Sequence, residues 1–580
     1  MKNTAIPTFM SVAFIVFAFP AYMAFAGETG PPNGEFEWDG IYDGTCTPMA
    51  SMPSWRENIG ANTEYTLENE GLRIIDSGTE NGSLHFYTFA WRARPEDGAV
   101  VEGRIKLINN TSRSGAFLHA SDGTHETSIT LYPGYLSTYL EQDGEIRHEM
   151  DTTSDFHTYR LAIRNADFFV WVDGEMVLDG TGKFTVPAYS GRNCVMFGSC
   201  SSAAQSEAVY ADVRYAALGE PPPLPPRYAQ AQDVVVYKEP GVYACFPSLV
   251  RMDDRALFTS FGTRTRRSHI DNTGGSARYI SRDQGYTWEP CEGENPIGAC
   301  MRNEDGSLAD ARAYGWREVP AEQREEFEKQ DITVRDVRPG VVAYLQGAYS
   351  RRSDDGGKTW QKQELQLPAH RSLMTYNSSS YVRLSNGTLL HAIYGELKED
   401  TATRTFILRS ADNGGTWWFL PLAADPAGTV RFNETALCEN ADGEVIAMMR
   451  SEPPEGGFLR LSISKDRGIT WSPAVETGMW GYPANLIPLH DGRMLCTYGY
   501  RQEPMGIRAA LSTDGGHTWD TENIIVLRND AAPFGSDLGY PISIEKSPGE
   551  IFTIYYFTMD DAITHVAGTH WTVPPAKPKE

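Results

Sequence analysis

Glu434 and Tyr540 occupy equivalent positions in two repeated hairpin segments of this sequence. Each stands nine residues before the glycine of its predicted turn, which is Gly443 in one segment and Gly549 in the other. A glutamate within hydrogen-bonding distance of a tyrosine can accept the phenol proton and so activate the oxygen as a nucleophile. Considered alone, Glu434 is better explained as a solvated strand end, and Tyr540 as a packed aromatic ring. Their shared position favours a nucleophile paired with its base.

Three arginines fall near the same end of the predicted strands. Arg450 ends the strand that follows Glu434, and Arg508 begins a third strand further along the chain. Arg501, in the nearby segment YGYR, competes with Arg508 for the same role. Planar guanidinium groups bind carboxylates through paired N–H donors. The pattern indicates a site for an anionic ligand, and the alternative for Arg501 or Arg508 is a surface position.

An eight-residue motif, Ser-x-Asp-x-Gly-x-Thr-Trp, recurs five times in the second half of the chain. Its glycine suits the positive φ of a tight turn, its aspartate can accept backbone N–H bonds, and its tryptophan can pack between sheets. Copies that lie 72, 57, 54 and 48 residues apart cannot share one pocket, so the motif predicts architecture: a turn between the third and fourth strands of successive propeller blades. The copies begin at Ser281, Ser353, Ser410, Ser464 and Ser512.

A second repeat, strand-turn-strand, precedes these motifs. Dividing the roughly 340 residues from 232 to 572 by a blade of about 55 residues gives six blades. In a four-stranded blade, the start of the first strand and the end of the second lie opposite the motif turn. Central pockets of propellers open at one end of the channel, so Glu434, Tyr540 and Arg450 are expected at the pocket end.

The rest of the chain divides into three further regions. Residues 1–26 have the layout of a secretory signal peptide, with an apolar run that ends in AFA. Residues 27–218 contain short alternating strands and predict a β-sandwich of the jelly-roll type. Residues 219–227, GEPPPLPPR, form a proline-rich linker before the propeller of residues 228–580. We therefore expect an all-β protein that is secreted or periplasmic and has no stable membrane insertion after signal cleavage.

The eight-residue motif is similar to the Asp-box, or BNR repeat, of the sialidase (neuraminidase) superfamily, and the resemblance covers residues 232–572. It implies a six-bladed β-propeller and an exo-glycosidase that retains anomeric configuration through a tyrosine nucleophile. Residues 433–450, NETALCENADGEVIAMMR, resemble the segment that carries the general base and one arginine of the carboxylate-binding triad. The resemblance makes Tyr540 the nucleophile, Glu434 its base, and Arg450 and Arg508 substrate-binding residues. The strand rhythm of residues 27–218 resembles concanavalin-like (laminin-G type) domains, which implies possible carbohydrate binding.

Two further assignments depend on the same resemblance. In sialidases, an aspartate between the first strand and the first Asp-box is the general acid, and the segment GTRTRRSHIDNTGG offers Asp271 alone. Sialidase propellers also begin with Phe-Arg-Ile-Pro, whereas ACFPS in this chain has Cys245 at the arginine position. Either Arg264 or Arg267 then supplies the missing guanidinium, or the substrate is not an ordinary sialic acid.

Composition limits the partners of the chain. A net charge of −25 argues against nucleic acid, but it leaves room for a small anionic ligand bound by local arginines. The eight cysteines form no zinc-type pattern, so no metal and no cofactor are expected. Cys194 with Cys200, and Cys291 with Cys300, are candidates either for disulfides or for buried free thiols. The expected partner is a glycan, and the expected state is a monomer.

These observations together predict an exported exo-glycoside hydrolase that removes a terminal acidic, sialic acid-like sugar. One alternative keeps the fold and mechanism but changes the substrate to a uronic acid or a neutral sugar of a polysaccharide. Another alternative is a carbohydrate-binding propeller without catalysis. Because the candidate residues all follow the linker, the sandwich is expected to add binding and not chemistry.

Overall fold

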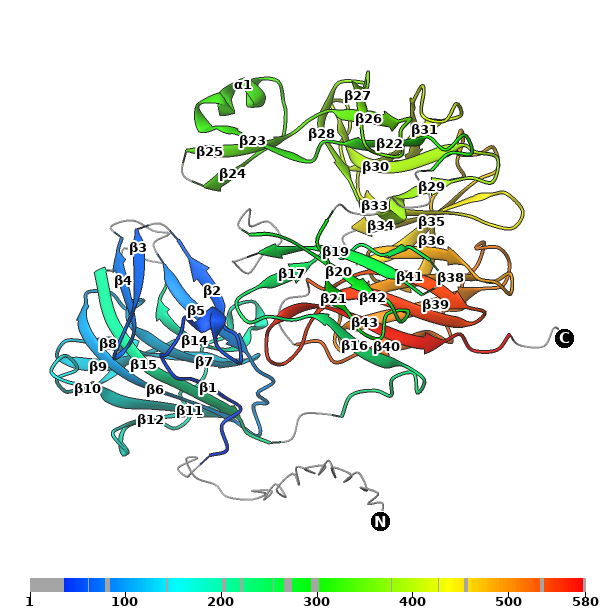
Figure 1. The fold of residues 1–580 in the computed structure, drawn as a ribbon. Helices are drawn as coiled ribbons and strands as arrows, with labels where there is room; N and C mark the ends of the chain where they lie inside the picture. Colours follow the sequence, from blue (N-terminus) through cyan, green and yellow to red (C-terminus); the bar gives the residue numbers. More distant parts are fainter. Residues whose placement is uncertain are drawn as a thin grey trace, which may run out of the picture.

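Nearly all the regular secondary structure in the described residues is β-strand, in two regions joined by a linker (Figure 1). The computed structural model describes residues 36–576 except 61, 79–83, 142–143, 201–204, 220–222, 254, 265–273, 294–301, 339, 377, 426, 453–456 and 533–536. The one α-helix within these ranges is α1 (Arg324–Lys329), and short 3-10 helices span Pro48–Ala50, Tyr189–Gly191, Ala321–Gln323 and Ser378–Ser380. No helix in the described part is long and apolar enough to cross a membrane. The all-β prediction is confirmed.

Residues 40–217 form a sandwich of two antiparallel sheets. One has the order β13 (Glu175–Gly180), β12 (Asp167–Val172), β11 (His157–Arg164), β6 (Ala99–Asn110), β15 (Gln205–Ala217), β4 (Gly71–Ser77) and β3 (Thr63–Glu68), with β1 (Gly40–Tyr42) also paired to β15. The other has the order β10 (Gly144–Glu149), β9 (Tyr135–Leu140), β8 (Glu126–Tyr132), β7 (Phe117–Asp122), β14 (Asn193–Ser199), β5 (His85–Ala90) and β2 (Arg56–Ile59). Buried aromatic side chains from both sheets, including Tyr87, Phe197 and Tyr215, pack together with Trp55 in one core. The likeness to concanavalin-like domains stays a prediction.

The region after the linker is a series of small antiparallel sheets. Five consecutive sheets contain β17 (Tyr243–Cys245), β18 (Val250–Arg251), β19 (Leu257–Arg264), β20 (Gly275–Ser281) and β21 (Glu289–Pro290); β22 (Leu308–Ala313), β26 (Ala348–Ser353) and β27 (Gln361–Glu364); β28 (His370–Thr375), β29 (Tyr381–Arg383), β30 (Leu389–Leu397), β31 (Arg404–Ser410) and β32 (Trp418–Ala423); β33 (Arg431–Glu439), β34 (Val445–Glu452), β35 (Phe458–Ser464) and β36 (Val475–Trp480); and β37 (Ala484–Pro488), β38 (Met494–Tyr500), β39 (Gly506–Ser512) and β40 (Ile525–Arg528). An inserted sheet of β23 (Trp316–Pro320), β25 (Val341–Leu345) and β24 (Val334–Arg338) carries α1.

A further sheet joins the two ends of this region. Its order is β16 (Gln232–Tyr237), β43 (Thr564–Thr572), β42 (Glu550–Thr558) and β41 (Gly539–Ser547), so the first strand after the linker pairs with the last strand of the chain. It contacts β37 and β38 on one side and β17 on the other. The sheet thereby connects the beginning and the end of the series, as in a β-propeller. The division into six blades stays our interpretation of these sheets.

The Asp-boxes lock the turns that precede the last strand of each of the five sheets. In the box after β35, the Asp466 carboxylate accepts the Thr470 N–H at 2.8 Å and the Ser464 hydroxyl at 2.9 Å, while the Ser464 oxygen accepts the Gly468 N–H at 2.8 Å. The same bonds recur in the other four boxes. Gly468 has a φ of 81°, and a Cβ there would lie 2.8 Å from Leu390 of the preceding sheet. The box therefore fixes both its own turn and the contact between sheets.

We expect the Asp466→Ala substitution to lower the free energy of unfolding by about 1–3 kcal/mol, because it leaves turn N–H groups without their acceptor. Activity per folded molecule should not change, since the end of β35 lies at the opposite end of its sheet from the start of β33, where Glu434 lies. Denaturant unfolding and activity assays measure the two effects. Lys465→Ala, at an exposed neighbouring side chain, is the control. A folded but inactive Asp466→Ala protein would contradict the architectural interpretation of the motif.

The end of the linker packs on the propeller. The Arg227 guanidinium donates to the Leu527 carbonyl at 2.6 and 2.9 Å, and the Tyr228 N–H donates to the Val526 carbonyl at 2.8 Å. These bonds attach residues 227–228 to β40. The domain limits inferred from the sequence stay predictions, but this end of the linker is not a free spacer.

Cys194 and Cys200 do not form a disulfide, which decides between the two alternatives for this pair. Cys194 lies at the beginning of β14 and Cys200 follows its end. Six residues of extended strand separate Cα atoms by about 20 Å, well beyond the reach of a disulfide. Cys291 is also free, and Cys300 lies outside the described residues.

Candidate active site

Glu434 and Tyr540, which are 106 residues apart in the chain, meet near the beginnings of β33 and β41. The Tyr540 hydroxyl donates a short hydrogen bond to Glu434 Oε1. The other carboxylate oxygen, Oε2, accepts a bond of 2.8 Å from Arg450 Nη1. Glu434 is only 7% exposed, so this carboxylate is buried and paired on both oxygens. The arrangement matches a nucleophile, its base, and a cation bound to that base.

The same local irregularity places both side chains. β33 shifts its register on β34 around Glu434, and β41 shifts its register on β42 around Tyr540. Such irregularities redirect a side chain from the normal strand alternation and are common beside active sites. Tyr540 also has a φ of 50°, which is unusual for a residue with a side chain. The shared hairpin position seen in the sequence thus corresponds to a register shift in both strands.

Aromatic rings enclose the phenol of Tyr540. The ring centroids of Phe246, Tyr376 and Tyr556 lie 4.6, 5.6 and 5.7 Å from that of Tyr540. Burial, and next the charge of Glu434, raise the pKa of Tyr540 well above its ordinary value. The phenol is therefore neutral near pH 7, and its proton must be removed by a base during any attack that it makes.

Arg450 and Arg501 are the guanidinium groups next to this pair. Arg450 lies over the Tyr482 ring, with its Cζ 4.2 Å from the ring centroid, and Arg501 lies 5.2 Å from the same centroid. Arg450 also bonds Glu452 at 2.6 Å. The charges of both arginines act on Tyr540 and partly oppose the rise of its pKa. The structure thus brings together the two arginines that end or follow second strands.

Arg508 does not join this cluster. Its guanidinium donates to the backbone carbonyls of Arg528 and Pro504, the latter at 2.9 Å, and stacks on Tyr500 with its Cζ 4.5 Å from the centroid. The register of β39 on β40 shifts at Arg508, and its side chain satisfies carbonyls left near this irregularity. Arg501, the competitor, occupies the place beside Tyr540 that Arg508 was expected to take.

Arg264 lies near Cys245, the residue that stands at the position of the expected arginine. β17 pairs with β19 so that Cys245 faces Gly262, and Arg264 is two residues further along β19. Cys245 is fully buried in the cluster that contains Tyr540, and burial raises its pKa to about 12 although the nearby charge of Arg264 lowers it. Arg264 Nε is buried and has no nitrogen or oxygen partner among the described residues. The Arg264 guanidinium thus lies beside the cysteine that stands at the expected arginine position.

Asp537 is a site residue that the sequence analysis missed. Its carboxylate accepts a bond of 2.5 Å from the Tyr556 hydroxyl and a second, short bond from the Tyr243 hydroxyl. Arg501 Nη2 lies 3.7 Å away and donates to the neighbouring Leu538 carbonyl at 2.9 Å. The position three residues before Tyr540 was a signal that could have identified this acid.

The predicted general acid lies outside the part of the chain that the structure describes. Asp271 belongs to the omitted segment 265–273, and so does Arg267, the alternative to Arg264. No cluster of three or more His, Cys, Asp or Glu residues suited to a metal ion occurs in the described ranges.

Comparison with known proteins agrees with the Asp-box assignment. A BNR repeat-like domain family matches residues 336–553, and a BNR/Asp-box repeat family matches residues 279–290. A sialidase from Micromonospora viridifaciens is 27% identical over 215 residues, a match that spans 31% of this chain and 31% of that protein. These sequence matches support the sialidase superfamily for the propeller region.

Two solved structures show low similarity to this chain. A protein of unknown function from Dyadobacter fermentans is 28% identical with a TM-score of 0.48, over 60% of this chain and 100% of that one. A mutant of NanB sialidase from Streptococcus pneumoniae is 12% identical with a TM-score of 0.39, over 86% of this chain and 99% of that one. Neither likeness identifies a substrate for this chain.

Proposed function

We propose that this protein is an exported, retaining exo-glycoside hydrolase that removes a terminal acidic sugar from a glycan. The observation that carries the proposal is the hydrogen bond from the Tyr540 hydroxyl to the buried Glu434 carboxylate. A tyrosine paired with a glutamate in this way is the nucleophile expected when the anomeric carbon itself bears a carboxylate, because a neutral phenol is not repelled by that charge.

The proposed reaction has two displacement steps. The Tyr540 oxygen attacks the anomeric carbon while Glu434 takes the phenol proton, and the glycosidic oxygen leaves with a proton from a general acid, for which Asp271 is our prediction. Water then attacks the anomeric carbon of the glycosyl-tyrosine intermediate and gives one proton to that same acid/base. The bond from this carbon to the Tyr540 oxygen breaks, and the oxygen recovers its proton from Glu434. Two inversions leave the released sugar with its original configuration.

Three guanidinium groups favour an anionic sugar in this site. Arg450 and Arg501 flank Tyr482, and the Arg264 side chain interacts with Cys245. Within the low-dielectric surroundings of buried aromatic rings, a substrate carboxylate would gain charge-assisted hydrogen bonds from such groups. Arg264 in this role would compensate for the cysteine that replaces the first arginine of the sialidase pattern.

We expect the Arg501→Met substitution to raise KM for an acidic glycoside by about 10- to 100-fold, through loss of a charge-assisted bond worth about 1.5–3 kcal/mol. KM for the matching neutral amide should change little. Arg508→Met is the control, because that guanidinium is bound to backbone carbonyls and should affect stability without changing the preference for charge. Arg450 is less suitable, since its loss would also remove the hydrogen bond to Glu434 Oε2. Equal effects of Arg501→Met on both substrates would contradict the acidic-sugar assignment.

A second candidate substrate class is a uronic acid or a neutral sugar of a polysaccharide, and the cysteine at position 245 is the observation that favours it. A screen of chromogenic glycosides that includes a sialoside, a glucuronide and neutral arabinosides distinguishes these classes. Hydrolysis of none of them, combined with measurable glycan binding, would instead support a binding propeller without catalysis.

A further inference from the structure

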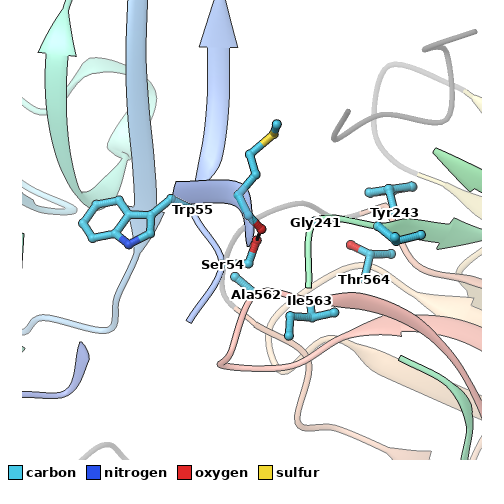
Figure 2. A pocket seen from close by; sticks show the side chains of 9 residues that line it. Ser54, Trp55, Gly241, Tyr243, Ala562, Ile563 and Thr564 are labelled. Carbon is cyan, nitrogen blue, oxygen red and sulfur yellow. Dashed lines mark hydrogen bonds between the residues drawn. The ribbon is translucent and has the colours of Figure 1, made fainter. Parts of the chain in front are cut away.

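The sandwich packs directly against elements that carry the candidate site. Figure 2 shows Ser54 and Trp55 of the sandwich on one side of a small cavity, with Gly241, Tyr243 and the turn between β42 and β43 on the other. The Ser54 N–H donates to the Asp561 carbonyl of this turn at 2.8 Å, and Ala562 packs within the sandwich core. A cavity of about 20 Å³ has room for little more than one water, so the two regions are in packing contact here.

Arg92 links the sandwich to the segment that leads to Tyr540. Its Nη2 donates to the Ala531 carbonyl at 2.7 Å, and its Nη1 lies 3.5 Å from the Asp560 carboxylate. Ala531 is the third residue after β40, and Asp560 lies in the turn after β42, the strand whose Tyr556 packs on Tyr540. A side chain of the sandwich therefore contacts the connections that follow β40 and β42.

Asp537, three residues before Tyr540, is bound by a residue that lines the contact between the two regions. Tyr243, which lines the cavity between the regions, donates to Asp537, and Asp537 lies beside Arg501. Gly539 and Tyr540 follow with φ values of 109° and 50°. A residue with a side chain keeps a left-handed backbone only where its surroundings over-determine it. The hydrogen bond from Tyr243 to Asp537 thus connects the contact with the sandwich to the backbone that precedes Tyr540.

We propose that the sandwich is a positioning module for the candidate nucleophile, and that Arg92 is a positioning residue that acts through Ala531 and through the turn after β42. This inference rests on the proposed function for its catalytic consequence. It differs from the expectation drawn from the proline-rich linker, under which the sandwich adds binding alone.

The test compares Arg92→Ala, Arg92→Lys and the unchanged full-length protein. The control is Arg147→Ala, on an exposed sandwich arginine paired with Glu149 at 2.9 Å. Backbone hydrogen exchange of residues 537–545 should be faster in Arg92→Ala, and kcat on a small glycoside should fall by about 10- to 100-fold with KM nearly unchanged, as for a misplaced reacting group. Arg92→Lys should recover part of both losses, because an ammonium can still donate to the Ala531 carbonyl.

Three results would overturn the inference. The first is unchanged exchange in residues 537–545 of Arg92→Ala, and the second is faster exchange with unchanged kcat. An equal effect in Arg147→Ala would also overturn it, since that arginine does not touch the propeller segment. If the unchanged protein cleaves no glycoside, the proposed function fails, and the exchange comparison alone still decides whether Arg92 holds the segment.

Discussion

Replacing Tyr540 with phenylalanine should lower kcat by about 10³-fold or more while the fold stays intact. The substitution removes one oxygen and leaves the ring packed against Phe246, Tyr376 and Tyr556. The lost oxygen is the atom that donates to Glu434, and in the proposed reaction it is the atom that bonds to the sugar. KM should change much less than kcat, because the arginines that would bind the substrate are untouched.

The measurement is kcat and KM on whichever glycoside the screen identifies, together with thermal unfolding. Tyr555→Phe is the matched control. Tyr555 is next to Tyr556 in β42, and the substitution removes a buried hydroxyl that forms a hydrogen bond of 2.5 Å with Thr569. The control should lose stability and keep its kcat. Near-normal hydrolysis by Tyr540→Phe would end the tyrosine mechanism and leave the fold assignment intact.

Glu434→Gln should lower kcat by about 10²- to 10⁴-fold, the usual contribution of a general base. The double variant Glu434→Gln with Tyr540→Phe should be barely slower than either single variant, because the two side chains form one device and each is inactive without the other. This non-additivity separates a coupled pair from two residues that contribute independently.

The pH dependence gives the second prediction a further readout. Because the pKa of Tyr540 is raised, the neutral phenol persists to higher pH than in an exposed tyrosine, and the tyrosinate does not become abundant between about pH 7 and 9. Raising the pH over this range should therefore not restore activity to Glu434→Gln. Recovery with rising pH, or losses that add in the double variant, would show that Glu434 does not take the phenol proton.

Local sequence patterns predicted the architecture of the second region because propeller strands repeat with turns at fixed offsets. The Asp-box specifies its own turn through Asp466, Thr470 and their equivalents, so five copies were sufficient to identify stacked sheets. The same periodicity located Glu434 and Tyr540, since residues at one position of repeated hairpins lie at one end of the sheets. A strand count does not show that both residues lie in register irregularities, which depend on pairing with the next strand.

The sequence by itself determined the all-β class, the repeated sheets and the pairing of Glu434 with Tyr540, because each follows from spacing within or between local repeats. The tertiary structure alone decided which arginine reaches that pair. The sequence predicts Arg501 and Arg508 at the same end of one sheet. The Arg508 guanidinium instead binds backbone carbonyls near a register shift, which keeps it away from Tyr540. The contact of Arg92 with Ala531 joins residues 439 positions apart, and such a contact depends on how two folded regions pack and has no local pattern.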